Sequence, residues 1–329
     1  MNTRSVAVGR FVQNLDEKDV VVVSSLARKK LEDCLSKINT TTLIARLDMA
    51  PWEGEGIPPI YEVEVSPDGL MFWGLFGAFP KNKISPLADI ALCIDLPWKE
   101  AYQLLSELLG WQVVYDWDEI SQGSRVYVSA DPNDVPGEAR SRLERGEFSL
   151  VTDPFCPKTE AIKITDGLIL RPGDGIASFG ELAKRFPNGF VLKPVWGYGS
   201  RDIHMHPIGP SYGYLRSHGG CSRDTIKELL CRPRQEDWML QPFFAPEIIR
   251  SFGTTEFRIW RIFAVRQSQS ESFKLLGGLW NQRASLKVHG ASNTTSGLIE
   301  MAGKNRKATP VQGTQRKPRG EEPSFGWYM

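Results

Sequence analysis

One run just past the middle of the chain places the tightest constraint on how this sequence can fold. Residues 190–201 form an apolar segment that ends in Lys193 and then turns through Gly197, Gly199 and Ser200. Glycine allows backbone N–H groups to approach an anion closely, and the lysine adds a positive charge beside them. The run therefore predicts a strand followed by a tight turn that can hold phosphate groups. A Gly-x-Gly turn also joins ordinary hairpins, and that alternative stays open.

Composition narrows the class of protein. The chain has 329 residues, of which 41% are hydrophobic and 24% charged, so it can form one large or two medium globular domains. Its formal net charge of +1 provides no overall attraction to nucleic acid or to an acidic membrane. The five cysteines are odd in number and lack a C-x-x-C pair, which favours free thiols in a reducing compartment. We therefore expect a cytoplasmic protein without nucleic-acid or membrane partners, and we leave homo-oligomer formation open.

The first half of the chain has an alternating α/β pattern. Residues 19–25 contain four consecutive valines, which predicts a strand buried on both faces. A second apolar segment, residues 90–94, is followed by a helix that Pro97 opens and Gly110 closes. This order predicts a mostly parallel sheet with helices between its strands.

Strands dominate the second half. Ser178 and Glu181 have capping-box spacing at the start of a short helix. The segments on either side of the glycine-rich turn predict an antiparallel pair, residues 190–195 and 202–207. Three longer strands are expected at residues 238–244, 256–265 and 273–285, so this half is predicted to be α+β.

These patterns divide the chain into three parts. Residues 1–147 are predicted to form an α/β domain, and residues 148–302 an α+β domain. Residues 303–329 are basic and polar and lack periodicity, which predicts a disordered tail.

The strand that starts at Glu256 has two different faces. Side chains alternate across a strand, so Glu256, Arg258 and Trp260 share one face. Phe257, Ile259 and Phe263 share the other, which is expected to be apolar. The polar face predicts one wall of a cleft; a solvated face with a surface ion pair is the alternative.

The polar segments of the second half follow one another in a fixed order. They are Lys158, Lys193 with its glycine-rich loop, and residues 238–244, 256–258, 277–283 and 292–297. Over about residues 150–300 this order and spacing resembles the ATP-grasp superfamily. The resemblance implies two α+β lobes around a nucleotide cleft, behind an N-terminal α/β domain.

The resemblance also implies roles for single residues. Arg258 and Arg283 match strand arginines that face the phosphates or the acyl substrate, and these are the expected catalytic residues. Lys193 is expected to face an open cleft, where its replacement would cost little stability. The expected cofactor-binding residues are Lys158, Lys193, Gly197, Gly199, Ser200, Gln241, Phe243, Glu247 and Glu256.

The family's metal motif, an E-x-N sequence near the end of the domain, has no counterpart in this chain. Asn293 is one uncharged candidate metal ligand, and Glu300 and Asn305 lie in or beside the predicted tail. The resemblance implies an ATP-dependent ligase that uses Mg²⁺ and joins a small carboxylate, an amino acid or a peptide, to an amine through an acyl phosphate. The alternative is a nucleotide-binding protein of the same kind that is truncated or catalytically impaired.

Overall fold

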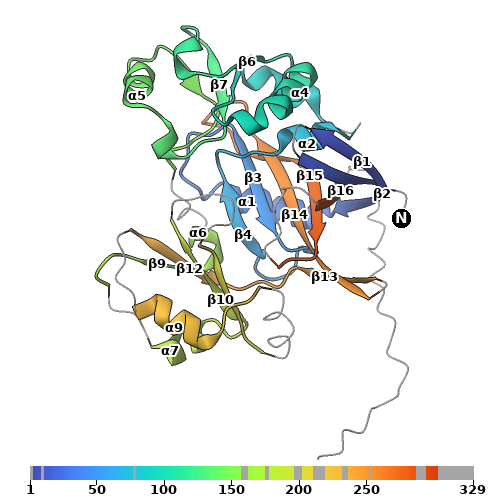
Figure 1. Ribbon diagram of the computed structural model, residues 1–329, viewed down its shortest axis with the longest axis vertical. Coiled ribbons are helices and arrows are strands. Elements are labelled where there is room, and N and C mark those ends of the chain that lie inside the picture. Colours follow the sequence, from blue (N-terminus) through green and yellow to red (C-terminus); the bar gives the residue numbers. More distant parts are fainter. Residues whose placement is uncertain are drawn as a thin grey trace, which may run out of the picture.

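The fold is mixed α/β and contains three sheets (Figure 1). The computed structural model describes residues 3–8, 11–76, 79–156, 162–174, 178–195, 202–209, 219–231, 236–251, 253–286 and 294–302. The predicted tail, residues 303–329, therefore lies outside the described residues. Among the described residues, no helix is both long and apolar enough to cross a membrane.

The largest sheet, here called the large sheet, occupies the middle of the molecule (Figure 1). Its main path has seven strands in the order β1-β2-β16-β15-β14-β3-β4, and an eighth, β13, also pairs with β14. All neighbours are antiparallel except β2 and β16, which are parallel. The strands are β1 (Thr3–Val8), β2 (Phe11–Val23), β3 (Ile44–Met49), β4 (Ile60–Glu64), β13 (Glu247–Ser251), β14 (Thr254–Val265), β15 (Lys274–Arg283) and β16 (Thr294–Met301).

The second sheet, here called the parallel sheet, has the strand order β6-β5-β7-β8. All its pairs are parallel, as the alternating pattern predicts. Its strands are β5 (Ile90–Leu92), β6 (Gln112–Val114), β7 (Arg125–Val128) and β8 (Ser149–Leu150). The helices nearest to it along the chain are α2 (Leu70–Gly74), α3 (Lys81–Ile84), α4 (Lys99–Leu109) and α5 (Gly137–Glu144).

The third sheet, here called the small sheet, has the order β11-β10-β12-β9 and is antiparallel throughout. The predicted pairing across the glycine-rich turn is confirmed, because Phe190 lies opposite His206. Its strands are β9 (Leu168–Leu170), β10 (Gly189–Pro194), β11 (His204–Pro207) and β12 (Trp238–Pro242). The neighbouring helices are α6 (Ile162–Thr165), α7 (Phe179–Arg185) and α9 (Arg223–Cys231).

Two helix boundaries follow the expected local signals. A 3₁₀ turn, Leu96–Trp98, contains Pro97 and leads into α4, and Gly110 ends α4 with φ of 77°. At the start of α7, Glu181 N donates to Ser178 Oγ and Ser178 N donates to Glu181 Oε2. These contacts confirm both helix boundaries. The sequence could predict them because each boundary depends only on residues within one or two turns.

The valine-rich strand differs from its prediction. Val20 is 37% exposed, whereas Val21 and Val23 are buried against α1 (Ser25–Leu35) on one face of the large sheet. At this point only one face of β2 is covered, and its side chains alternate between buried and more exposed. A run of valines is instead typical of strands that are covered on both faces. It also belongs to the large sheet rather than to the parallel one.

Strands from both sides of the predicted boundary at residue 147 share the large sheet. β1 to β4 come from the first part of the chain, and β13 to β16 from the second. β14 is the centre of this arrangement, because its first half pairs with β13 and its second half with β3. The division into residues 1–147 and 148–302 stays a prediction.

Candidate functional site

The small sheet presents two different faces. Its register places Lys193 opposite Met239 and Gln241 opposite Val191, so these four side chains project to the same side. The opposite face is apolar and packs against α7 and α9 through a cluster that includes Phe190, Leu192 and Leu240. Lys193 and Gln241 therefore lie on the face opposite α7 and α9.

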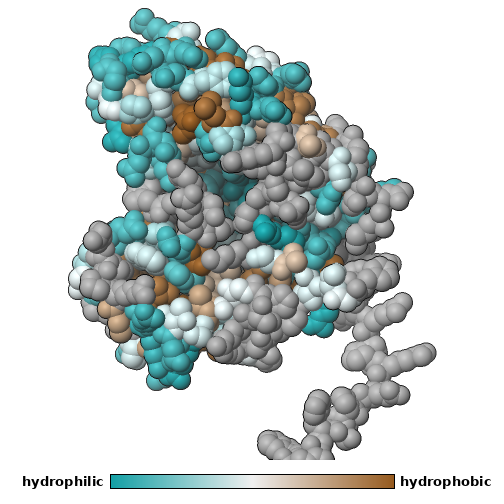
Figure 2. Space-filling model, viewed as in Figure 1, coloured by the Kyte–Doolittle hydropathy of each residue, from teal (hydrophilic) through white to brown (hydrophobic). Residues whose placement is uncertain are grey.

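The face that carries Lys193 is turned toward the large sheet. Val191 and Met205 pack against Phe257 and Ile259 of β14 in one apolar cluster. Phe243, directly after β12, is buried in the same cluster. The two sheets thus approach each other through β10 and β14. On the surface, the molecule is hollowed between the parts that contain the parallel and small sheets, and hydrophilic residues lie at the visible floor of the hollow (Figure 2).

Lys193 itself bridges the two sheets. Its Nζ donates a hydrogen bond to the backbone oxygen of Tyr61 on β4 at 2.9 Å. Only 5% of the residue is exposed, so Lys193 is buried between the sheets and the expectation of an open cleft at this point is wrong. The physical reason is the pairing of β4 with β3, which brings a segment 132 residues away beneath β10.

Gln241 and Phe243, two of the predicted cofactor-binding residues, also form hydrogen bonds within the fold. Gln241 is buried, and its Nε2 donates to Thr165 Oγ1 at 3.3 Å. The backbone nitrogen of Phe243 donates to the oxygen of Gly189 at 2.8 Å. These contacts hold the end of β12 firmly against β10 and α6.

Three of the predicted residues form a separate group on the other face of β14. The Arg258 cluster consists of Asp19, Glu247, Glu256, Arg258 and Gln282. Arg258 donates to Asp19 at 2.8 Å and to Gln282 at 3.1 and 2.9 Å, and its Nε lies 3.8 Å from Glu247. Gln282 in turn donates to Glu256 at 2.5 Å. Burial raises the pKa of Glu247, although Arg258 acts against that rise.

The Arg258 cluster faces away from the small sheet. The guanidinium of Arg258 lies over the ring of Trp280, 4.0 Å from its centroid, and Trp280 packs in the core that α1 covers. Phe257 and Ile259, one position to either side, face the small sheet instead. Arg283 lies opposite Phe257 and therefore on the small-sheet side. The strand alternation thus separates Arg258, Glu247 and Glu256 from Lys193, Gln241 and Arg283.

Five predicted site residues lie outside the described residues: Lys158, Gly197, Gly199, Ser200 and Asn293. In the part of the chain that the structure describes, no group of three or more His, Cys, Asp or Glu side chains is arranged to hold a metal ion.

The face of β14 that was expected to be apolar carries a charged residue. Arg261 shares that face with Ile259 and Phe263, and its Nε lies 3.5 Å from Asp48 Oδ2 on β3. The sequence could have predicted this charge. Residues 257, 259, 261 and 263 share one face of the strand, and Arg261 stands between the apolar Ile259 and Phe263. The expectation of an apolar face is therefore wrong at this position.

Arg261 belongs to a group of opposite charges, the arginine–aspartate cluster, which consists of Arg46, Asp48, Asp68 and Arg261. Arg46 and Asp48 are buried, whereas Asp68 is partly exposed. Arg46 donates to both oxygens of Asp48, at 2.6 and 3.0 Å, and to Asp68 Oδ1 at 2.5 Å. Burial opposes the charge of Arg46, but Asp48 and Asp68 hold its pKa well above the usual value. Burial tends to raise the pKa of Asp68, but Arg46 and Arg261 outweigh it and the pKa is lowered.

The segment that carries Asp68 is anchored to the parallel sheet. Tyr127 on β7 donates to the oxygen of Pro67, and Ser129, just after β7, donates to the oxygen of Ser66 at 3.1 Å. Ser66 in turn donates to the oxygen of Val128 at 2.8 Å. The carboxyl end of β7 therefore fixes Asp68 above the large sheet.

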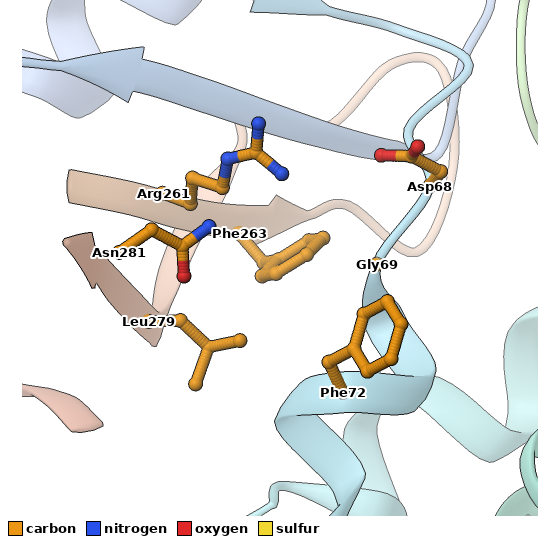
Figure 3. Close-up of a pocket in the computed structure, with 7 residues that line it drawn as sticks. All are labelled: Asp68, Gly69, Phe72, Arg261, Phe263, Leu279 and Asn281. Atoms are coloured by element: carbon orange, nitrogen blue, oxygen red, sulfur yellow. The ribbon is translucent and has the colours of Figure 1, made fainter. Parts of the chain in front are cut away.

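A pocket opens between Asp68 and the large sheet (Figure 3). Residues from the segment before α2, from α2, and from β14 and β15 line it: Asp68, Gly69, Phe72, Arg261, Phe263, Leu279 and Asn281. Arg261, Asn281 and Leu279 line one side of the pocket, and Asp68 and Phe72 lie across from them (Figure 3). Asn281 lies in the predicted segment 277–283, but the sequence pattern singles out neither Asp68 nor Arg261, because only the sheet pairing brings their segments together.

No protein-family model matches the chain, and no curated protein matches it. Among solved structures, it is similar to one titled as a provisional gamma-glutamylcysteine synthetase from Methylobacillus flagellatus KT. The match has a TM-score of 0.39 and 11% sequence identity, and it covers 79% of each chain. A similarity of this size supports no conclusion about activity.

Proposed function

We propose that this chain is an ATP-dependent ligase of the carboxylate–amine type that holds its nucleotide beside Lys193, at the end of β10 that leads into the glycine-rich run. The observation that carries the proposal is the position of Lys193. This lysine is the last side chain before Pro194 on β10, it shares a sheet face with Gln241, and that face is turned toward β14. The sequence supports the same phosphate-binding role for Lys193, because this residue lies just before the glycine-rich run.

In this proposal the chain's own residues bind and orient the reactants. Lys193 neutralises phosphate charge from the small sheet, and Arg283 approaches from the facing side of the large sheet. Gln241 and Phe243 form the wall against which the adenine packs, since both lie on the segment that joins the two sheets. Such positioning requires no nucleophile from the protein.

The proposed reaction has two steps. A carboxylate oxygen of the substrate attacks the γ-phosphorus of ATP, which forms an acyl phosphate and releases ADP. The nitrogen of the second substrate then attacks the acyl carbon, so the C–N bond forms as the C–O bond to phosphate breaks and the amine loses a proton. We propose amino acids or peptides as the carboxylate and amine substrates.

Magnesium is the usual partner of ATP, and it prefers carboxylate oxygens. The described residues do not fit this role, because both oxygens of Asp48 and one of Asp68 accept from Arg46. We therefore derive no step through the metal. Asn293, the predicted ligand, lies outside the described residues.

The test combines binding with turnover. Purified protein is titrated with ATP by calorimetry and is then incubated with ATP, Mg²⁺ and pooled amino acids while phosphate and ADP are measured. We expect saturable ATP binding, and phosphate release that depends on at least one amino acid. Lys193→Met should reduce both, whereas Lys184→Met on α7 should change neither.

Two outcomes separate this proposal from its alternatives. ATP binding without turnover over a wide substrate panel would favour a nucleotide-binding protein that lacks ligase activity. Equal ATP affinity in the wild type and both lysine variants would show that Lys193 and the glycine-rich run do not bind phosphate. The proposed function would then be contradicted as well.

A further inference from the structure

Cys221 and His204 form a thiol–imidazole pair beside the small sheet. Cys221 Sγ lies 3.8 Å from Nδ1 of His204, which is within hydrogen-bonding distance for sulfur. Both residues are partly exposed. An imidazole next to a thiol can take its proton and then stabilise the thiolate as an imidazolium. The pair therefore has the composition of an activated cysteine.

The fold holds both members of this pair in place. The backbone nitrogen of Cys221 donates to the oxygen of Met205 at 2.6 Å, and its oxygen accepts from Nδ1 of His206 at 3.0 Å. The ring of His204 stacks on Trp238, with ring centroids 6.0 Å apart and an interplanar angle of 12°. The thiol and the imidazole are thus positioned before any reactant arrives.

A helix end and a positive charge lie close to the thiol. Cys221 directly precedes Ser222, whose Oγ accepts from the nitrogen of Thr225 at 3.0 Å and so caps α9. The N-terminal end of a helix favours a nearby negative charge. Burial lowers the pKa of His206, and the charge of Arg223 adds to this decrease, which places that guanidinium close to β11. Both features favour the thiolate form of the cysteine.

The acidic residue nearest along the chain is Asp224, in the first turn of α9, and its charge opposes a thiolate. Its side chain is 92% exposed and lies 3.8 Å from Lys227, so water and that lysine screen its charge. The neighbouring strands β10 and β12 place Leu192 and Trp238 beside His204, and neither carries a charge. Among the described residues, the positive groups therefore dominate around the thiol.

The other cysteines have different surroundings. Cys34 and Cys93 are buried, and burial raises the pKa of both thiols, to about 11 for Cys93. Cys156 Sγ lies 3.6 Å from the backbone oxygen of Asn39, an acceptor that favours the protonated thiol. Cys231 is exposed, but it is the last residue of α9, where the helix end disfavours a negative charge. Helix α9 thus has one cysteine at each end, in opposite electrostatic settings.

We propose that Cys221 is a reactive thiol, activated by His204, that forms mixed disulfides with small-molecule disulfides. His204 takes the proton of Cys221, and the thiolate attacks one sulfur of the disulfide. An S–S bond to Sγ forms as the original S–S bond breaks, and the displaced sulfur leaves as a thiolate that takes up the proton. The protein thiol is oxidised and the displaced half is reduced, so no further oxidant is required. The proposal goes beyond the proposed ligase function and uses neither ATP nor Lys193.

The first test compares the two cysteines of α9 in the wild type. The reduced full-length protein is mixed with hydroxyethyl disulfide, a small neutral disulfide, at pH 7, and the adducts are located over time by peptide mass spectrometry. We expect Cys221 to react at least about threefold faster than Cys231, because a lowered thiol pKa increases the thiolate fraction more than it reduces nucleophilicity. A smaller ratio, or the reverse order that exposure alone would produce, would overturn the proposal.

The second test removes the imidazole. His204→Asn keeps a polar side chain but cannot take up the thiol proton. At pH 7 the rate at Cys221 should fall about threefold, and the pH at which this rate is half-maximal should rise, while both values stay unchanged at Cys231. Lys227→Met removes an exposed positive charge from the middle of α9, so it is the matched control and should leave the rate at Cys221 unchanged.

An unchanged rate at Cys221 in folded His204→Asn would show that the imidazole does not activate the thiol, which would overturn the proposal. Thermal melting shows whether the variant folds. If it does not fold, the wild type still decides, because the half-maximal pH must be lower for Cys221 than for Cys231. None of these measurements involves ATP, so a failure of the proposed ligase function is distinguished from a failure of this inference.

Discussion

The Nζ atom of Lys193 lies 2.9 Å from the backbone oxygen of Tyr61, and this hydrogen bond joins the small sheet to the large one. Lys193 thus has a structural contact in addition to the ligand role proposed for it. Because the residue is buried, its replacement should affect stability as well as binding.

Two substitutions separate these effects. Lys193→Met removes the charge and keeps most of the aliphatic bulk, whereas Lys193→Ala removes both. Both should lower ATP affinity by roughly ten- to a hundredfold, since one charge-assisted contact is lost. Lys193→Ala should also reduce the free energy of unfolding by about 1–3 kcal/mol, measured by urea titration. If the variants lose stability but keep their ATP affinity, Lys193 has only a structural role, through its hydrogen bond to Tyr61.

Arg258→Met should destabilise the fold. The side chain is 13% exposed and interacts with Asp19, Glu247 and Gln282, so its loss leaves carboxylates without their partner. Because Asp19 and Glu247 are partly exposed, we expect a loss of about 1–3 kcal/mol in the free energy of unfolding, less than for a fully buried pair. Lys227→Met, at an exposed ion pair on α9, is the control and should change little.

The same variant tests the predicted catalytic role of Arg258. Activity is measured well below the unfolding temperature, where the variant is folded. Unchanged turnover of the folded variant would show that Arg258 has only a structural role, which is to join β2 to β14 through Asp19. A large fall in kcat with native circular dichroism would support the catalytic prediction, despite the position of Arg258 on the far face of β14.

Gly297→Ala should destabilise the large sheet. A Cβ at this position would lie 2.3 Å from ring atoms of Trp280, which is itself fixed by a hydrogen bond from Nε1 to the oxygen of Asp19. We expect a loss of about 3 kcal/mol, because neither the ring nor the strand can move away freely. Gly137→Ala on α5 has open space around it and should be neutral or slightly stabilising, as thermal denaturation will show.

Stability should fall below pH 6.5 in a way that depends on His206. Burial lowers the pKa of His206, while its Nδ1 donates to the oxygen of Cys221 at 3.0 Å. The unfolded chain takes up a proton near the ordinary value of 6.5, whereas the folded chain does so only at lower pH. Unfolding therefore binds a proton in this window, and the free energy of unfolding decreases as the pH falls.

His206→Asn preserves a donor near the Nδ1 position and removes the titration. Urea unfolding at several pH values should show a shallower decrease for this variant than for the wild type. Identical slopes for the wild type and the variant would contradict the assignment to His206.

Local sequence signals determined the elements of this fold. Pro97 and Gly110 delimit α4, Ser178 caps α7, and the turn after residues 190–195 joins an antiparallel pair, as predicted. Each of these features depends on backbone preferences and hydrogen bonds within a few residues, so each can be inferred from the chain alone. The mixed α/β class follows from the same patterns.

Only the tertiary structure decided which elements share a sheet and which faces meet. The parallel pairing of β2 with β16 brings Asp19 to Arg258, and the pairing of β3 with β14 brings Asp48 to Arg261. Alternation along β14 predicts that Arg258 and Arg261 lie on opposite faces, but not which face meets the small sheet. That choice depends on the packing of distant apolar residues against one another, which no local pattern records.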